Sequence, residues 1–339
     1  MKTTDFKEFC AKAKKIVGKS SLPILDYVLI KAGSLTVSDL EITLIQEIEG
    51  LKDLPAFTLN FKDFSQILDK LKDTEISFDV KDEFIISLVS KKGVFNLTGC
   101  DPLDYPRNPE GFENSEFDYL SLKDIKLIKK AVNYVAKDEL RPVMNTVFIS
   151  DHIVGSDSHR LAFYKREGFK NEFMIPAKVI DLIDEKSEIS VFGSEYNLKF
   201  VSDKFTLLYR KIEGEYPKYK RVIPTEFKSF FNIDASQLSE ILDLALLSAN
   251  KSSGLVRLQN DTDLQTLQIS SRDIDYGKSF LHTVEVENSG EFIEFGAKIQ
   301  FLQSIIKTEK MNVCTFKLSD ASRAFIINDE VLLMPMEIK

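Results

Sequence analysis

The chain has 339 residues, of which 43% are hydrophobic and 29% are charged, a composition typical of globular rather than disordered proteins. This length is too great for one ordinary hydrophobic core and predicts two or three domains. The net charge of -8 counts against a general nucleic-acid-binding protein unless the positive charges are gathered on one surface.

The N-terminus, MKTTDFKEFCAKAKK, is charged where a secretory signal would be apolar, and no apolar run approaches the ~20 residues that span a bilayer. We therefore expect a cytoplasmic protein with no membrane partner. Cys10, Cys100 and Cys314 are far apart and lack C-x-x-C spacing, which favours buried reduced thiols over disulfides or a zinc site. No phosphate-binding glycine loop occurs either, so we expect no metal and no cofactor.

The first predicted element is a helix over 5–17, in which apolar residues recur at steps of three and four. Segments of period-two alternation, such as VFNLTG at 94–99 and FTLLYRKI at 205–212, predict half-buried antiparallel strands. Further helices are predicted at 60–73, 121–137, 175–186, 235–251 and 296–310. This mixture predicts an α+β fold with helices on one face of antiparallel sheets.

The sequence repeats with a step of roughly 110 to 120 residues. A strand followed by a helix start recurs in FTLNFKDFSQILDKL, FMIPAKVIDLIDEK and IEFGAKIQFLQSIIK, which begin at residues 57, 173 and 293. Shorter matches keep nearly the same step: LPILDYVLI with RPVMNTVFI, Ser38-Asp39 with Ser156-Asp157 and Arg272-Asp273, and Tyr105-Pro106 with Tyr216-Pro217. We predict three homologous domains, over 1–115, 116–227 and 228–339.

Positive charge is concentrated on the predicted helices, while the rest of the chain is strongly acidic. On the helix over 121–137 an apolar side formed by Ile125, Ile128, Val132 and Val135 lies opposite a lysine side. One such stripe is usually a solvated helix face, but its recurrence on equivalent helices favours a surface that attracts a polyanion through its phosphates. The outward lysines are Lys7, Lys14, Lys15, Lys126, Lys130 and Lys137.

The stretch VGSDSHRLA at 154–162 gathers a carboxylate, two hydroxyls, a histidine and an arginine. It suggests a nucleophilic triad, but neighbours on an extended strand point to opposite faces, so Ser158 and His159 cannot act together on one substrate. The sequence has no G-x-S-x-G motif, and His152 with His159 lacks the helical spacing of a metal-ligand pair. We therefore predict no enzyme and no catalytic residues, with a hydrolase centred on His159 left as an alternative.

The chain ends in an apolar run that comprises Leu332, Leu333, Met334, Pro335 and Met336. Two interpretations of this run stay open. It is either a last strand stopped by proline or an exposed lip whose flexible methionines suit several partners.

Several stretches together resemble one family. They are VGSDSHRLA, KIEGEYPKYKRVIP at 211–224, RPVMNTVFI, SLPILDYVLI with VSDLE at 37–41, and the terminal LLMPM. In this order, and with the threefold repeat, the whole chain resembles the beta subunit of bacterial DNA polymerase III, the sliding clamp. The resemblance implies a head-to-tail homodimer of three-domain chains that closes into a six-domain ring, with helices lining the hole.

Such a ring encircles double-stranded DNA without sequence specificity and carries no catalytic step. It tethers DNA polymerase and the clamp loader through short linear motifs. The pocket for these motifs corresponds to Ser156, Ser158, His159, Arg160, Leu161, Pro217, Arg221, Val222, Arg323, Leu332, Leu333, Met334, Pro335 and Met336.

The resemblance implies two further sets of residues. The ring-closing contact corresponds to Phe95 and Leu97 in the first domain and to Leu246 and Leu247 in the third, although the pattern alone favours an ordinary core for these four residues. A DNA-contacting loop position corresponds to Lys19.

Two residues depart from the family. Glycine is usual where Ser158 stands, which predicts a less free backbone at the pocket rim. Glu337 stands where a basic residue usually follows Met-Pro-Met, which predicts an altered preference for acidic partner motifs. A clamp-fold scaffold that binds peptides without encircling DNA stays open as the alternative function, and so does a phage or plasmid origin.

Overall fold

The computed structural model describes residues 1–18, 20–72, 74–82, 84–113, 116–138 and 140–338, so Lys19 lies outside the described residues. Two compact units divide the chain, and each is described by itself. The first comprises Met1–Ile125, Phe169–Asn171 and Lys178–Ile212, and the second Lys126–Gly168, Glu172–Ala177 and Glu213–Lys339. No helix within the described ranges is long and apolar enough to cross a membrane.

The six predicted helices are present among the described residues, and each is shorter than expected. They are α1 (Lys7–Ala13), α2 (Phe61–Leu71), α3 (Leu122–Ala131), α4 (Ala177–Ile180), α5 (Ala235–Leu246) and α6 (Ile299–Glu309). The helix predicted over 175–186 is reduced to the single turn of α4, because the N–H groups of Leu182 and Ile183 donate to carbonyls only three residues back.

The helix predicted over 121–137 also ends early. After α3 the chain makes a 3₁₀ turn over Val132–Tyr134, so Val135 and Lys137 lie beyond the helix. Val135 is extended, and the Ala136 N–H donates to the Met144 carbonyl rather than to a helical one. A tertiary hydrogen bond therefore replaces the next helical one and ends the helix.

Antiparallel strands make up most of the remaining framework. In the first unit they are β1 (Tyr27–Lys31), β2 (Ser34–Ser38), β3 (Ile42–Glu47), β4 (Phe57–Asn60), β5 (Ile76–Asp82), β6 (Ile85–Ser90), β7 (Gly93–Thr98), β8 (Asp118–Leu120), β13 (Ile189–Gly193), β14 (Asn197–Val201) and β15 (Thr206–Arg210). In the second they are β9 (Thr146–Ile149), β10 (His152–Ser156), β11 (Arg160–Lys165), β12 (Phe173–Pro176), β16 (Ser229–Asp234), β17 (Leu255–Asp261), β18 (Thr266–Asp273), β19 (Lys278–Glu285), β20 (Glu287–Gly290), β21 (Ile293–Lys298), β22 (Val313–Leu318), β23 (Phe325–Ile327) and β24 (Val331–Leu333).

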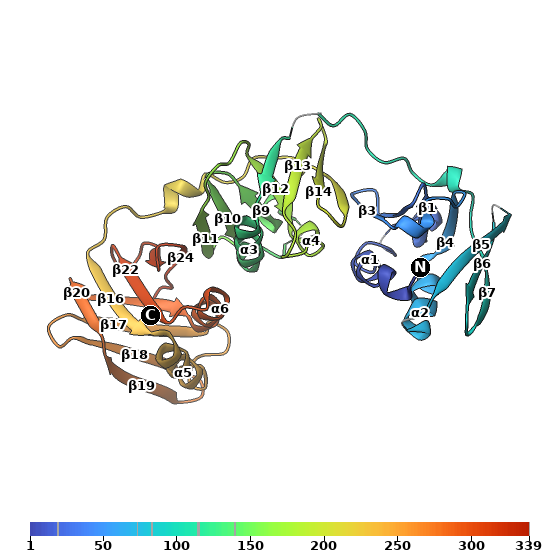
Figure 1. Ribbon diagram of the computed structural model, residues 1–339. Coiled ribbons are helices and arrows are strands. Elements are labelled where there is room, and N and C mark those ends of the chain that lie inside the picture. The colour runs from blue at the N-terminus through green and yellow to red at the C-terminus, as the bar shows by residue number, and fades with distance from the viewer. Residues whose placement is uncertain (19, 73, 83, 114–115, 139, 339) are drawn as a thin grey trace. The chain divides into compact units, whose positions relative to one another are not determined.

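One strand order recurs three times along the chain. The first sheet of each repeat runs β4-β1-β2-β3, β12-β9-β10-β11 or β21-β17-β18-β19, and the second runs β5-β6-β7, β8-β13-β14-β15 or β16-β22-β23-β24. A helix follows β4, β12 and β21, and in the third repeat α5 and α6 pack against each other (Figure 1). This confirms the predicted α+β fold of three repeats, whereas the boundaries at 115 and 227 stay a prediction.

Strand pairing joins neighbouring repeats within each unit. In the first unit β3 pairs with β15, with Ile42 opposite Tyr209. In the second unit β11 pairs with β24, with Arg160 opposite Leu333. At each junction an edge strand of one repeat's first sheet, β3 or β11, pairs with the last strand of the following repeat's second sheet, β15 or β24. The backbone hydrogen bonds therefore continue from one repeat into the next.

Aromatic rings fill the core of the third repeat. Phe231 stacks on Phe316 with ring centroids 4.5 Å apart, and Phe295 meets Phe325 edge-on at 5.0 Å. None of the four is more than 1% exposed. They come from β16, β21, β22 and β23, so the core lies between the two sheets of the repeat and holds them together.

Candidate functional site

A cavity of about 270 Å³ lies in the second unit, between the turn that joins β10 to β11, the segment around the 3₁₀ helix Tyr219–Val222, and the end of β24. The side chains that line it are Arg141, Met144, Ser156, Ser158, His159, Arg160, Leu161, Tyr216, Pro217, Lys218, Tyr219, Val222, Leu332 and Met334. Beneath it, Leu161, Tyr219 and Leu332 join a buried apolar cluster with Val154 and Ala324. The cavity therefore has an apolar floor and a polar rim, which suits one or two apolar side chains of a peptide.

The turn between β10 and β11 is held by its own side chains. Asp157 Oδ1 accepts from the backbone N–H groups of His159 (3.0 Å) and Arg160 (2.7 Å). Ser156 Oγ accepts from the backbone N–H of Ser158 at 3.2 Å. One wall of the cavity is therefore held by hydrogen bonds between residues that are close together in the sequence.

The C-terminal segment forms the opposite wall. The Met334 N–H donates to the His159 carbonyl at 2.9 Å, which extends the pairing of β24 with β11 by one step. Leu333 is fully buried and ends the strand, whereas Met334 is 39% exposed at the cavity. The run is therefore the end of a last strand followed by an exposed methionine, and its use by several partners stays a prediction.

Gly155 brings this turn close to the second repeat's first helix. A β-carbon at Gly155 would collide with the carbonyl oxygen of Ala131, the last residue of α3. The glycine of VGSDSHRLA therefore permits β10 to pass directly beneath the end of α3.

Arg160 lines the cavity but directs its donors into the protein. Its guanidinium pairs with Asp157 at 2.8 Å, donates to Ser304 Oγ at 3.0 Å, and lies 4.7 Å from the ring centroid of Phe301 on α6. The His159 ring also stacks on Phe301, with centroids 5.8 Å apart. Both side chains thus hold the turn against α6, and Arg160 positions the wall rather than offering free donors to a ligand.

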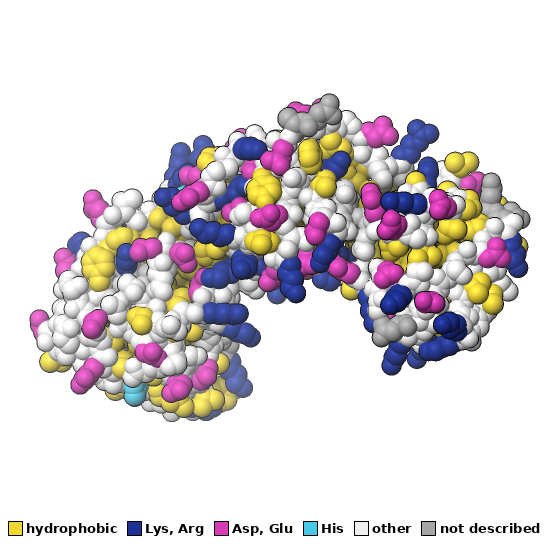
Figure 2. Space-filling model, in the orientation of Figure 1, with side chains coloured by type: hydrophobic (Ala, Val, Ile, Leu, Met, Phe, Trp, Pro, Cys, Tyr) yellow, Lys and Arg dark blue, Asp and Glu magenta, His cyan; other side chains and the backbone are white. Residues whose placement is uncertain are grey.

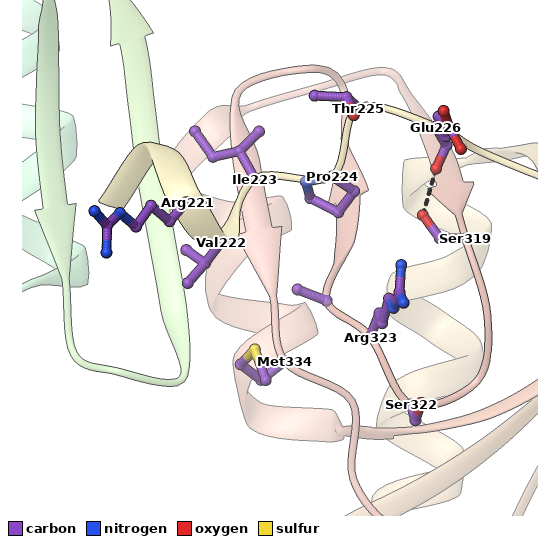
Figure 3. Close-up of a pocket in the computed structure, with 11 residues that line it drawn as sticks. Arg221, Val222, Ile223, Pro224, Thr225, Glu226, Ser319, Ser322, Arg323 and Met334 are labelled. Carbon is purple, nitrogen blue, oxygen red and sulfur yellow. Dashed lines mark hydrogen bonds between the residues drawn. The ribbon is translucent and has the colours of Figure 1, made fainter. Parts of the chain in front are cut away.

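The structure brings most of the predicted pocket residues into this cavity: Ser156, Ser158, His159, Arg160, Leu161, Pro217, Val222, Leu332 and Met334. Arg221 and Arg323 instead line an adjoining groove of about 490 Å³, which shares Val222 and Met334 with the cavity (Figure 3). Pro335 and Met336 line a third hollow of about 570 Å³. Leu333 lines none of these three, because its side chain is buried in β24.

Five lining residues were missed from the sequence: Arg141, Met144, Tyr216, Lys218 and Tyr219. A signal existed for three of them, since Arg141 and Met144 lie in the repeated stretch RPVMNTVFI and Tyr216 in the repeated Tyr-Pro pair. Burial raises the pKa of the Tyr216 hydroxyl, which keeps its proton and has no hydrogen-bond partner among the described residues.

The backbone at Ser158 supports one stability prediction. Its φ is 76°, and the equivalent residue of the first repeat, Leu40, has φ of 75°. A β-carbon in this left-handed region costs about 1–2 kcal/mol, which the greater flexibility of unfolded glycine partly offsets. We expect Ser158→Gly to be more stable than Ser158→Ala by about 0.5–1 kcal/mol in urea unfolding, since both lack the hydroxyl and differ only at Cβ. Equal stabilities would show that the turn relieves the strain elsewhere.

The predicted outward lysines fall in both units, and each group is described by itself. In the first unit Lys7, Lys14 and Lys15 are exposed, with Lys14 3.2 Å from Asp69. In the second unit Lys126 and Lys137 are exposed, and Lys130 is half-buried against Glu309 at 3.0 Å. Figure 2 shows Lys and Arg side chains gathered along the edge of the second unit that carries α3 and α6.

Two strand edges expose apolar side chains. β7 ends its sheet, and five of its six residues are exposed, so the prediction that 94–99 is half-buried was wrong. Among the described residues no strand pairs with the outer edge of β7. β19 likewise ends its sheet, and beside it Leu247, which follows α5, is 71% exposed. Phe95, Leu246 and Leu247 are therefore not core residues, and Leu97 is only half-buried.

The described residues include no group of three or more His, Cys, Asp or Glu side chains that could hold a metal ion. Their three cysteines are free. Burial raises the pKa of the Cys10 and Cys314 thiols to about 12, so both stay protonated and unreactive at neutral pH.

Known proteins resemble this chain in sequence and in fold. The family model for the C-terminal domain of the DNA polymerase III beta subunit matches residues 220–332. The beta sliding clamp of Halalkalibacterium halodurans is 33% identical over 267 residues, which cover 69% of this chain and 70% of that protein. The DNA polymerase III subunit beta of Pseudomonas aeruginosa has a TM-score of 0.88 at 21% identity, covering 100% of this chain and 99% of that one. The sliding clamp of Bacillus subtilis has a TM-score of 0.87 at 21% identity, covering 100% and 98%.

Proposed function

Because this chain belongs to the family of bacterial beta sliding clamps, the beta subunits of DNA polymerase III, we propose that it is a processivity factor in DNA replication. Two copies form a ring around duplex DNA and slide along it without reading its sequence. The ring holds DNA polymerase and the clamp loader through short peptide motifs. The observation that carries this proposal is the pair of strand edges, β7 and β19, that the repeat leaves unpaired.

The internal repeat supplies the argument for ring closure. Within the chain, β3 pairs with β15 and β11 pairs with β24. By their place in the sheets, β19 is the third equivalent of β3 and β11, and β7 is the third equivalent of β15 and β24. The remaining pair, β19 of one copy with β7 of the next, makes a head-to-tail contact that closes after two copies.

The two known junctions also predict the register of the third. Thr43 lies opposite Leu208 at one junction, and Leu161 lies opposite Leu332 at the other. The matching strand positions are Ser279 in β19 and Asn96 in β7. We therefore place Asn96 opposite Ser279 of the second copy, which sets Phe95 opposite Phe280 on the apolar face.

The exposed lysines support the contact with DNA. Lys7, Lys14 and Lys15 lie on or just after α1, and Lys126 lies on the equivalent helix α3. These side chains neutralise phosphates and read no bases, so the ring moves freely while its topology keeps it on the strand. The net charge of -8 then belongs to surfaces that face away from the DNA.

The cavity described above is the site for partner motifs. Its apolar floor takes an apolar anchor, and the turn residues orient the peptide. No catalytic step belongs to this function: Ser158 Oγ accepts from Arg141 at 3.3 Å, and the His159 ring lies on Phe301. A protein that acts on the bacterial chromosome works in the cytoplasm.

Retention on circular DNA tests the encircling function. We expect the protein, once loaded by a clamp loader onto a nicked plasmid, to elute with the plasmid at 0.5 M salt and to be lost when the plasmid is linearised. Lys126→Glu with Lys137→Glu should weaken loading severalfold, because two phosphate contacts become repulsive. A stable monomer that never co-elutes with plasmid, but still binds peptides, would establish the scaffold alternative.

A further inference from the structure

Glu309, at the C-terminal end of α6, is a buried carboxylate with only 4% of its side chain exposed. It accepts hydrogen bonds from Tyr134 Oη at 2.7 Å and from Tyr164 Oη at 2.5 Å. The Lys130 ammonium, from α3, lies 3.0 Å from its other oxygen. Three residues of the second repeat, Lys130, Tyr134 and Tyr164, therefore surround one carboxylate of the third repeat.

Lys130 is the cation that balances this carboxylate. Burial, together with the nearby Glu309, raises the pKa of the Tyr134 hydroxyl, and burial and both neighbouring groups do the same for Tyr164. Both tyrosines therefore stay neutral donors, so the charge of Glu309 is balanced by Lys130 and not by them. Glu330 lies near the same two groups: burial raises the pKa of its carboxyl, Glu309 raises it further, and Lys130 lowers it.

A phosphate of passing DNA would have to compete with Glu309 for Lys130. Lys130 is 35% exposed, and its ammonium also lies 5.7 Å from the ring centroid of Tyr164. Removing the cation would leave a buried charge unpaired, which costs far more than an exposed lysine gains from one phosphate. Lys126, one turn earlier on α3, is exposed and pairs with no carboxylate of the residues that the structure describes.

We propose that Glu309 withholds Lys130 from DNA and thereby lowers the clamp's affinity for duplex DNA by about one phosphate contact. This inference rests on the proposed function and corrects the assignment of Lys130 to the DNA-contacting set. Withholding a lysine suits a sliding ring, since topology keeps the ring on DNA and each further contact slows its movement. The ion pair between Lys130 and Glu309 also joins α3 to α6 across the junction of the second and third repeats.

The salt dependence of DNA binding tests this assignment. Fluorescence anisotropy with a labelled 30-base-pair duplex, titrated with dimeric protein between 50 and 200 mM NaCl, yields the slope of log K against log salt. We expect Lys126→Gln to reduce that slope by about 0.9 and Lys130→Gln to leave it unchanged. Glu309→Gln should increase the slope by about 0.9 and the affinity by about threefold, because Lys130 is released.

The double variant completes the cycle. We expect Lys130→Gln in the Glu309→Gln background to return both affinity and slope to those of the parent protein. A thermal melt of each variant checks that the packing of α3 against α6 is intact. If Glu309→Gln does not fold, the slope measured for Lys130→Gln alone still tests whether Lys130 contacts DNA. A slope reduced by about 0.9 in Lys130→Gln would overturn the proposal while leaving the clamp function intact. A parent protein that binds no duplex at any salt would instead overturn the clamp function.

Discussion

Oxidation of the Asn96→Cys/Ser279→Cys variant should yield a covalently closed dimer as the main product. The register of the two internal junctions places these residues opposite each other between copies. Directly opposed residues of antiparallel strands have Cα atoms about 4.5–5.5 Å apart, within the range that a disulfide spans. The cross-link should form at both contacts of the ring, and non-reducing gels with intact mass spectrometry would show a dimer with two disulfides.

The register between β7 and β19 is tested with a second cysteine pair, shifted by one residue. Asn96→Cys/Lys278→Cys shifts the pair by one residue and leaves Phe95 and Phe280 in place. It should cross-link much more slowly, since one step turns the side chain to the other face of the strand. Cys100 is partly exposed, so both variants are made with Cys100→Ser. Equal yields from the two pairs would exclude the proposed register, and monomer from both would exclude the β7 to β19 contact.

Val222→Glu should weaken binding of a peptide by about 30-fold to 100-fold, the second large effect expected. Val222 lines both the cavity and the adjoining groove, and it is 53% exposed in the free protein. Glutamate therefore stays solvated when the protein is free, so the fold is little affected. A bound apolar anchor would bury the charge without a partner, which costs about 2–3 kcal/mol.

The measurement is isothermal titration calorimetry with a ten-residue synthetic peptide that carries a central Leu-Phe pair. Val313→Glu is the matched control, because Val313 is 46% exposed on β22 and lines none of the cavities described above. It should bind the peptide as the parent protein does. If Val222→Glu also binds like the parent, the peptide does not occupy this cavity.

Several features of the site could be predicted because they depend on neighbours in sequence. The turn at Ser156 to Arg160 is closed by the side chains of Ser156 and Asp157, and the same residue types recur at Ser38-Asp39. Its likeness to the first repeat identified it as a structural position. What the second repeat adds, His159, Arg160 and Leu161, was then predicted to belong to the pocket, and all three line the cavity.

Other features could not be predicted, since nothing local reports them. Leu333 follows Leu332 in the same apolar run, yet only Leu332 reaches the cavity. Alternation along β24 turns neighbouring side chains to opposite faces, and which face meets the cavity depends on the register with β11. The exposure of β7 could not be predicted for the same reason. The alternating sequence pattern of a strand is the same whether the strand lies in the middle or at the edge of a sheet.

The sequence by itself determined the threefold repeat, the α+β class, most helices, the segregation of lysine onto helices, and the two stretches that form the pocket walls. Their signals are short-range periodicities and recurring turns, which each stretch of chain carries within itself. Only the tertiary structure showed that Lys130 is paired with a carboxylate, because its partner Glu309 lies 179 residues away in the chain. Helical periodicity shows that Lys130 points outward from its own repeat, but it cannot show what the next repeat places there.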